Sequence, residues 1–339
     1  MSHFDLALLG FGNVGRALAR LLLRKENELK EEYDLTFAMT GIATGRHGTL
    51  IDQNGIDLQG AIRNVEAGLS LPGASPTLTS LEFIHHCGAD VLFENTPVNH
   101  QTGQPAIDHL KAALEGGMHG ITANKGPVVH AYQELTELAA RVRRKFYFEA
   151  VVMDGAPIFS LFRAALPAAR LQSFNGILNS TTNLILERME AGESFEEAVK
   201  YTQAVGLAET DPSADIDGWD ATIKVAALVT VLMGVPFKPQ EVERTGIRGI
   251  TPGMIAEAKA AGKRWKLVCS AGWDGKKIRG SVAPRLVTPD SQLYTTNGSS
   301  SIIEFHTDTL TSLSVVEGDP TPETTAYGLL ADFLNAVRS

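Results

Sequence analysis

Phe4-Asp-Leu-Ala-Leu-Leu-Gly10-Phe-Gly12-Asn-Val-Gly15-Arg-Ala-Leu-Ala-Arg-Leu-Leu-Leu23 is the stretch that decides the fold. An apolar run typical of a buried strand leads directly into G-x-G-x-x-G, and the residues after it have the period of a helix packed on a sheet. Gly10 permits a tight turn, Gly12 lets the backbone approach a pyrophosphate, and Gly15 allows close packing of helix and strand. The stretch therefore predicts dinucleotide binding at a helix N-terminus, the alternative being a glycine turn without a ligand.

The candidate cofactor residues include this motif and the ends of two later strands. They are Gly10, Phe11, Gly12, Asn13, Val14, Gly15, Thr44, Arg46, Thr96 and Pro97. Proteins that prefer NAD usually carry an acid after the second strand, but here Arg46 follows and no acid occurs before Asp52. A guanidinium at this place can pair with a 2′-phosphate, which favours NADP over NAD, although loop arginines are common on any surface.

Strands and helices alternate up to residue 152, which predicts an α/β fold with a Rossmann-type doubly wound domain. Residues 49–80 form a loop-rich insertion with one helix, and residues 145–152 are the last expected strand. After Pro157 the pattern changes. Antiparallel strands with one polar face are expected at three places, residues 264–271, 277–283 and 300–307. We expect two domains, 1–149 and 150–320, the second of mixed α/β type.

Composition excludes several classes of partner. A net charge of -9 argues against nucleic acid and anionic membranes, because both require basic patches. The longest apolar run, residues 225–235, is shorter than the roughly 20 residues that a membrane helix needs. Two cysteines, Cys87 and Cys269, stand far apart in apolar contexts, which fits a reducing cytosol. With no N-terminal targeting pattern, the sequence predicts a cytoplasmic protein.

An acid-rich stretch from Glu209 to Lys224 runs directly into the apolar residues 225–234. This pattern predicts a buried helix whose charged first turns face the protein interior. Asp217, Asp220 and Lys224 are spaced three and four residues apart, so they are expected on one helical face. The alternative is an ordinary surface salt bridge between Asp220 and Lys224, worth about 0.3–0.5 kcal/mol. The run His85-His86-Cys87 is interpreted as helix-end packing, because adjacent residues rarely share a tetrahedral metal.

Four stretches together resemble homoserine dehydrogenase, which interconverts homoserine and aspartate 4-semialdehyde. They are residues 10–15, 122–125, 176–186 and 206–224. The length of 339 residues is similar to that of the short form without a C-terminal regulatory domain. The resemblance implies an NAD(P) cofactor, a second-domain sheet that supports a homodimer or a dimer of dimers, and a last helix, 321–339, that returns to the first domain.

The resemblance also implies residue roles. Lys224, Lys125 and Asp220 would be catalytic, with Lys125 also beside the cofactor. The substrate-binding set would be Glu209, Asp215, Asn179, Thr181 and Thr182, with Glu209 holding the substrate ammonium group. The chemistry is consistent with these roles: reducing an aldehyde requires a proton on oxygen, which a positioned lysine can donate. Two lysines in one cleft would lower each other's pKa.

Two places depart from the pattern of the family. Backbone atoms after the strand at Glu149 would hold a monovalent cation such as Na⁺, through Glu149, Val152, Asp154 and Ala156. This chain carries Met153-Asp154 where the family has glycines. The late glycine-rich loop near the nicotinamide would include Gly318, here followed by Asp319-Pro320. Other hypotheses are a dehydrogenase for another small amino acid and a dinucleotide-binding sensor with little turnover.

Overall fold

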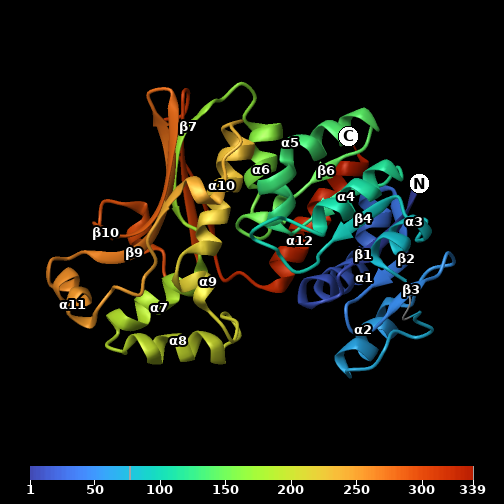
Figure 1. Cartoon of the computed structure of the whole chain (residues 1–339), viewed down its shortest axis with the longest axis horizontal. Coiled ribbons are helices and arrows are strands. Elements are labelled where there is room, and N and C mark those ends of the chain that lie inside the picture. The colour runs from blue at the N-terminus through green and yellow to red at the C-terminus, as the bar shows by residue number, and fades with distance from the viewer. Residues whose placement is uncertain (76–77, 339) are drawn as a thin grey trace. The chain divides into compact units, whose positions relative to one another are not determined.

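The computed structural model describes residues 1–75 and 78–338 and divides the chain into two compact units (Figure 1). Unit 1 comprises residues 1–157 and 321–339, and unit 2 comprises residues 158–320. The chain therefore leaves unit 1 after Pro157 and returns to it at Thr321. The predicted boundary, between residues 149 and 150, lies earlier than the observed one.

Unit 1 is an α/β unit. Its elements are β1 (Ser2–Leu9), α1 (Asn13–Tyr33), β2 (Leu35–Ala43), β3 (Thr49–Ile51), α2 (Leu58–Glu66), α3 (Ser80–His86), β4 (Val91–Glu94), α4 (Ala106–Glu115), β5 (His119–Thr122), α5 (Lys125–Arg141), β6 (Phe146–Tyr147), the 3-10 helix η1 (Glu149–Val151) and α12 (Pro322–Val337). The expected insertion at 49–80 thus contains the short strand β3 as well as a helix.

The sheet of unit 1 has the order β3-β2-β1-β4-β5-β6. All neighbouring strands run parallel except β3, which pairs antiparallel with β2 at the edge. The strand order reverses direction between β1 and β4. In open α/β sheets this switch point, at the carboxyl ends of the strands, is where ligands bind. The expectation of a doubly wound domain is confirmed.

Helix α12 belongs to the core of unit 1 although it is the last helix in the chain. Figure 1 shows it in red among the blue and green elements of this unit. Phe333 is fully buried and makes edge-to-face contacts with Phe4 of β1 and Phe93 of β4, at centroid distances of 6.0 and 6.2 Å. Unit 1 is therefore built from both ends of the chain.

Unit 2 contains a second sheet and several helices. Its elements are α6 (Ile158–Ser160), the π-helical turn η2 (Leu161–Ala165), β7 (Leu171–Ile177), α7 (Ser180–Glu190), α8 (Phe195–Ala204), α9 (Ser213–Ile216), α10 (Trp219–Leu232), the 3-10 helix η3 (Pro239–Glu241), β8 (Val242–Arg244), α11 (Pro252–Ala260), β9 (Arg264–Asp274), β10 (Lys277–Val287), the 3-10 helix η4 (Gln292–Thr295), β11 (Ser301–Thr307) and β12 (Leu313–Glu317).

The second sheet has the order β12-β11-β7-β9-β10-β8. It is antiparallel apart from the parallel pair β10 and β8. The three predicted strands are β9, β10 and β11, whereas β7, β8 and β12 add strands that periodicity did not predict. Helix α10 packs on β9 and β10, and most of its residues are buried, as its apolar sequence predicted. The packing of α10 on this sheet forms part of the core of unit 2.

The strand expected at residues 145–152 is only two residues long, Phe146–Tyr147. Its expected continuation forms the 3-10 helix η1 instead, because Glu149 N donates a hydrogen bond of 2.6 Å to Asp332 of α12. A contact with the other end of the chain thus ends the strand. In the part of the chain that the structure describes, every helix is too short or too polar to cross a membrane.

Candidate functional site

The glycine motif joins β1 to α1 at the switch point of the first sheet. Gly10 has φ +102°, and a Cβ on it would lie 2.4 Å from the carbonyl oxygen of Asn95, the residue after β4. A Cβ on Gly15 would lie 2.4 Å from the carbonyl oxygen of Gly10. These two glycines are therefore required by the packing of the chain itself.

Gly12 differs, because a Cβ there would meet no protein atom within 4 Å and its φ of -75° suits any residue. It precedes the first turn of α1, where Asn13, Val14 and Gly15 supply main-chain N–H groups without intrahelical partners. Close approach of a pyrophosphate to these groups explains a glycine that packing does not require. The loop fits a dinucleotide.

Asn95 is a candidate site residue that the sequence did not reveal. Both polar atoms of its amide are buried, and neither has a hydrogen-bond partner among the residues that the structure describes. Leaving such groups unpaired costs about 1–3 kcal/mol. Because the main chain of Asn95 lies against Gly10, a polar group of the cofactor is well placed to relieve this cost. Asn95 is recognised as a candidate only by these buried side-chain atoms without partners.

Thr44 and Arg46 follow β2, at the same edge of the sheet. The Thr44 hydroxyl donates to Gly48 O (3.0 Å) and accepts from His47 N (2.6 Å), so it closes the turn. Arg46 is exposed and makes no hydrogen bond or ion pair with any residue described. Its guanidinium is thus available to an anionic ligand, whereas Thr44 has a structural task.

Lys125 is the first residue of α5, and Asn124 is the N-cap of that helix. The Asn124 side chain accepts from Gly126 N (3.0 Å) and donates to Thr96 O (3.1 Å). The loops after β4 and β5 are therefore tied together, which places Thr96 and Lys125 at neighbouring strand ends. Pro97 is exposed in the same segment.

In unit 2, four predicted residues from the N-cap of α7, from α9 and from α10 lie close together. Asn179, the N-cap of α7, donates to Asp215 Oδ1 (2.6 Å) and to Asp220 Oδ2 (3.1 Å). Lys224 Nζ lies 3.0 Å from Asp220 Oδ2 and donates to Leu178 O at 2.7 Å. The Lys224 and Asp220 side chains are 17% and 19% exposed. This Asn179–Asp215–Asp220–Lys224 cluster is more enclosed than an ordinary surface salt bridge.

The two threonines of α7 support this cluster in different ways. Thr182 is fully buried and donates from its N–H and hydroxyl to Asn179 Oδ1, at 2.9 and 2.8 Å, which orients the amide nitrogen towards the acids. Thr181 is buried as well, and its hydroxyl is close enough to Asp215 to lower the pKa of that carboxyl. Thr182 therefore fixes Asn179, while Thr181 acts on the Asp215 carboxyl.

Electrostatics make Asp215 unusual. Burial raises its pKa, and the adjacent negative charge of Asp220 raises it further. Hydrogen bonds from Asn179 and Thr181 and the charge of Lys224 lower the pKa in part. A half-buried carboxylate with a raised pKa is stabilised when a cation approaches, so this position suits the ammonium group of an amino acid.

Two residues of the acid-rich stretch lie elsewhere. Glu209 is exposed, and its main-chain carbonyl accepts a hydrogen bond of 3.3 Å from the Gln203 side chain. The expectation that Asp217 shares a face with Asp220 and Lys224 is wrong. Gly218, with φ +79°, separates α9 from α10, so Asp217 ends the first helix and pairs with Arg248.

The segment expected to bind a cation packs against α12. Asp154 has φ +45° and accepts a hydrogen bond of 3.2 Å from Thr324, and its carbonyl oxygen would lie 2.6 Å from a Cβ on Gly328. Within residues 1–75 and 78–338, no cluster of three or more His, Cys, Asp or Glu side chains could hold a metal ion. Carbonyl binding of Na⁺ by Glu149, Val152, Asp154 and Ala156 stays a prediction.

Gly318 is exposed and follows β12 in unit 2, and Lys125 and Lys224 belong to different units. The contribution of Gly318 to cofactor binding stays a prediction. So does the effect of the two lysines on each other's pKa.

Both units of the chain are similar to known proteins. Residues 10–149 match the family model for the NAD binding domain of homoserine dehydrogenase, and residues 157–334 match the homoserine dehydrogenase model. The chain is 34% identical to the NAD(+)-dependent homoserine dehydrogenase of Pseudomonas canavaninivorans, over 100% of this chain and 97% of that protein. It is 36% identical to the homoserine dehydrogenase of Methanocaldococcus jannaschii, over 99% of each.

A solved structure is similar as well. A mutant of a hyperthermophilic archaeal homoserine dehydrogenase in complex with NADPH has a TM-score of 0.83 and 27% identity, covering 99% of this chain and 98% of that one. Sequence and fold agree over the whole length. The chain therefore belongs to the homoserine dehydrogenase family of NAD(P)-dependent oxidoreductases.

Proposed function

We propose that this chain interconverts L-homoserine and L-aspartate 4-semialdehyde, with hydride transfer to or from NAD(P), in the biosynthesis of threonine and methionine. The observation that carries the assignment of roles is the Asn179–Asp215–Asp220–Lys224 cluster, in which a buried amide holds two carboxylates and one of these pairs with a lysine. A hydroxy-amino acid needs this combination, because its ammonium group pairs with a carboxylate and its reacting oxygen gains or loses a proton.

Lys224 is the proposed proton donor and acceptor. Asp220 and the carbonyl of Leu178 hold its Nζ in one position, at 3.0 and 2.7 Å. In the oxidative direction a neutral Lys224 accepts the hydroxyl proton as the carbonyl forms, and in the reductive direction its ammonium protonates the aldehyde oxygen. Bound NAD(P) supplies the chemistry of hydride acceptance and donation. Lys125, at the start of α5, is the proposed second active-site lysine.

Asp215 is the proposed partner of the substrate ammonium, with Glu209 as a second carboxylate. The raised pKa of Asp215, caused first by burial, supports this role, since the carboxylate is stabilised by an added positive charge. Glu209 is exposed, so its approach to the substrate rests on the family resemblance alone.

A direct spectrophotometric assay tests the function. Purified protein is given L-homoserine with NADP⁺ or NAD⁺, and reduced cofactor is followed by absorbance. We expect homoserine-dependent turnover that other hydroxy-amino acids do not support. Lys224→Ala should lower kcat by roughly 10²–10⁴-fold while reduced-cofactor affinity stays within about two-fold of wild type. Turnover unchanged in Lys224→Ala would refute the role of this lysine, and cofactor binding without turnover in wild type would favour a sensor.

Cofactor preference is proposed to depend on Arg46. Its exposed guanidinium, without a partner among the described residues, supports recognition of a 2′-phosphate and hence NADP. The relative from Pseudomonas canavaninivorans is named as NAD(+)-dependent, so both cofactors must be compared. Arg46→Ala should weaken NADPH binding more than NADH binding. Clear preference of wild type for NAD would show that Arg46 does not select the cofactor.

A homodimer formed through the sheet of unit 2 is proposed as the assembly. Supporting it, one face of this sheet carries partly exposed small polar residues, among them Ser173, Asn175, Ser270 and Ser281, around a shallow hollow. Light scattering should give twice the chain mass of 36.4 kDa, or four times for a dimer of dimers. A cytoplasmic location is also proposed. Cys87 and Cys269 are free and buried, which supports a reducing environment.

A further inference from the structure

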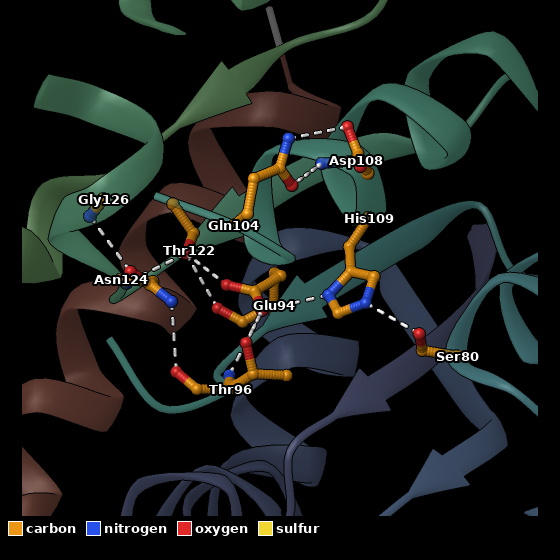
Figure 2. Close-up of polar contacts among 9 residues, drawn as sticks. All are labelled: Ser80, Glu94, Thr96, Gln104, Asp108, His109, Thr122, Asn124 and Gly126. Carbon is orange, nitrogen blue, oxygen red and sulfur yellow. Dashed lines mark hydrogen bonds and ion pairs between the residues drawn. The ribbon is translucent and has the colours of Figure 1, made fainter. Parts of the chain in front are cut away.

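We propose that Glu94 is a positioning residue, whose buried carboxylate ties together the two strand-end loops that carry Thr96 and Lys125. The inference rests on the proposed function only for the role of Lys125, and the geometry lies wholly within unit 1. Figure 2 shows Glu94 among Thr96, Thr122 and His109, with contacts on several sides of its carboxylate.

Glu94 is the last residue of β4 and is fully buried. Its Oε1 lies 3.4 Å from Nδ1 of His109 in α4, a side chain only 3% exposed. The other ring nitrogen, Nε2, lies 2.8 Å from the hydroxyl of Ser80, the first residue of α3. Two helices behind the sheet thus brace the carboxylate through one imidazole.

The first loop held by Glu94 is the one that follows β4. Thr96 donates to Glu94 Oε1 twice, from its main-chain N–H at 3.2 Å and from its hydroxyl. These bonds turn the chain back on itself just past the strand end. The contacts therefore fix Thr96, which is a predicted cofactor residue.

The second loop follows β5, whose last residue, Thr122, pairs with Glu94 across the sheet. The Thr122 hydroxyl lies within donating distance of Glu94 Oε2 (3.1 Å) and of Glu94 O (2.8 Å), and it accepts from Asn124 N at 2.9 Å. Asn124 in turn caps α5 and donates to Thr96 O at 3.1 Å. Each loop is thus linked to Glu94 and to the other loop.

The position of Lys125 follows from this network. It is the residue between Asn124, whose N–H and side chain are both committed, and Gly126, whose N–H donates to Asn124 at 3.0 Å. A shift of Asn124 therefore moves the first turn of α5 and Lys125 with it. Misplacement of a reacting group by about 1 Å can lower a rate roughly 100-fold.

A carboxylate buried at this place is destabilising compared with an apolar side chain that would fill the same space. Burying a charge has a large desolvation penalty, and well-packed apolar residues often replace buried ion pairs without loss of stability. What an apolar residue cannot do is accept hydrogen bonds from two loops at once. Glu94 and Thr122 therefore serve the geometry of the strand ends beyond filling the core.

Thr122 offers the sharpest test, because two substitutions separate hydroxyl from shape. Thr122→Val keeps the shape and loses the hydroxyl, whereas Thr122→Ser keeps the hydroxyl and loses a buried methyl group. A positioning role predicts that Thr122→Val lowers kcat roughly 10–100-fold and weakens reduced-cofactor binding, while Thr122→Ser stays near wild type despite a lower melting temperature. The KM for homoserine should change by less than about two-fold in either variant, since its proposed site lies in unit 2.

Thr40→Val is the matched control. Thr40 is a fully buried threonine of the same sheet, and its hydroxyl donates only to Leu6 O at 3.3 Å. It should keep wild-type kcat and cofactor affinity. Equal losses in Thr40→Val and Thr122→Val, or a loss in Thr122→Ser as large as in Thr122→Val, would overturn the proposal in favour of a structural role.

Glu94→Gln removes the charge and turns one acceptor into a donor, and should lower kcat with unchanged homoserine KM if it folds. If Glu94→Gln does not fold, the variants Thr122→Val, Thr122→Ser and Thr40→Val decide whether the network positions the loops. Absence of homoserine turnover in wild type would count against the proposed function alone. In that case the affinities of the same variants for NADPH or NADH, measured by cofactor fluorescence, still decide whether Glu94 and Thr122 position the loops.

Discussion

At the scale of single residues, the three glycines of the motif have different reasons for being glycine. Gly10 and Gly15 face main-chain carbonyl oxygens at distances where a Cβ cannot fit. Gly12 faces no protein atom within 4 Å. One motif therefore combines two packing requirements with one binding requirement, and substitution can separate them.

Gly12→Ala should keep the stability of wild type and weaken cofactor binding, because the added methyl group meets only the ligand. Gly15→Ala should destabilise unit 1 by about 1–3 kcal/mol, because the methyl group displaces the main chain of Gly10. Thermal unfolding and titration with reduced cofactor measure the two effects. Similar loss of stability in both variants would contradict this division.

Lys266 of β9 is a second residue with a measurable signature. It is fully buried, and its Nζ donates to Asn183 Oδ1 (2.7 Å) and Thr296 O (2.6 Å). Burial, and then the charge of Arg264, lower its pKa from 10.5 to about 8. A neutral amine still has two N–H groups for these two acceptors, so deprotonation preserves both bonds.

The sign of the pH effect follows from this shift. Between about pH 8 and 10.5 the unfolded chain binds more protons at Lys266 than the folded chain, so its contribution to the free energy of unfolding rises with pH. The rise is at most about 1.4 kcal/mol per pH unit. The free energy of unfolding of wild type and of Lys266→Met can be measured by denaturant titration near pH 7 and near pH 10. From pH 7 to pH 10, wild type should gain stability relative to Lys266→Met. A pH-independent difference would show that Lys266 stays protonated.

At the scale of elements, local patterns predicted what local forces determine. The strand, glycine turn and helix at Phe4–Leu23 and the Asp220–Lys224 pair were predicted correctly because their partners are neighbours in sequence. Asp217 was misplaced because Gly218, in a left-handed conformation, ends one helix and begins another. Gly218 is visible in the sequence, but spacing alone does not show that it takes the left-handed conformation that separates α9 from α10.

Longer-range elements could not be predicted in this way. The strand expected at 145–152 ends at Tyr147 because Asp332 captures the N–H of Glu149. The pairing of Glu94 with His109 joins a strand end to a helix, and neither neighbourhood indicates the other. Such contacts arise from packing between segments, which periodicity does not describe.

At the scale of the whole molecule, the chain is divided so that one unit interrupts the other. Phe333 of α12 fills the core of unit 1, whereas the three tryptophans, Trp219, Trp265 and Trp273, all belong to unit 2. Tryptophan fluorescence therefore reports unit 2 alone, and circular dichroism reports both units. The two signals allow each unit to be followed separately.

Phe333→Ala should destabilise unit 1 by about 3–5 kcal/mol, since a fully buried ring with two aromatic contacts is removed. The circular dichroism transition should move to lower denaturant and cofactor binding should fall, while the fluorescence transition stays in place. Phe305→Ala, at a fully buried position in β11, is the control that should shift the fluorescence transition. Equal shifts of fluorescence in both variants would mean that the units unfold as one.

The insertion of unit 2 into unit 1 also sets the order in which the protein is made. As the chain leaves the ribosome, residues 158–320 are complete before α12 has been synthesised. Domains generally fold as units during synthesis, and usually the N-terminal one is first. Here the N-terminal unit can complete its core only after residues 158–320 have been made, because Phe4 and Phe93 pack against Phe333. The nascent cofactor unit therefore exposes an unfinished core until α12 has been synthesised.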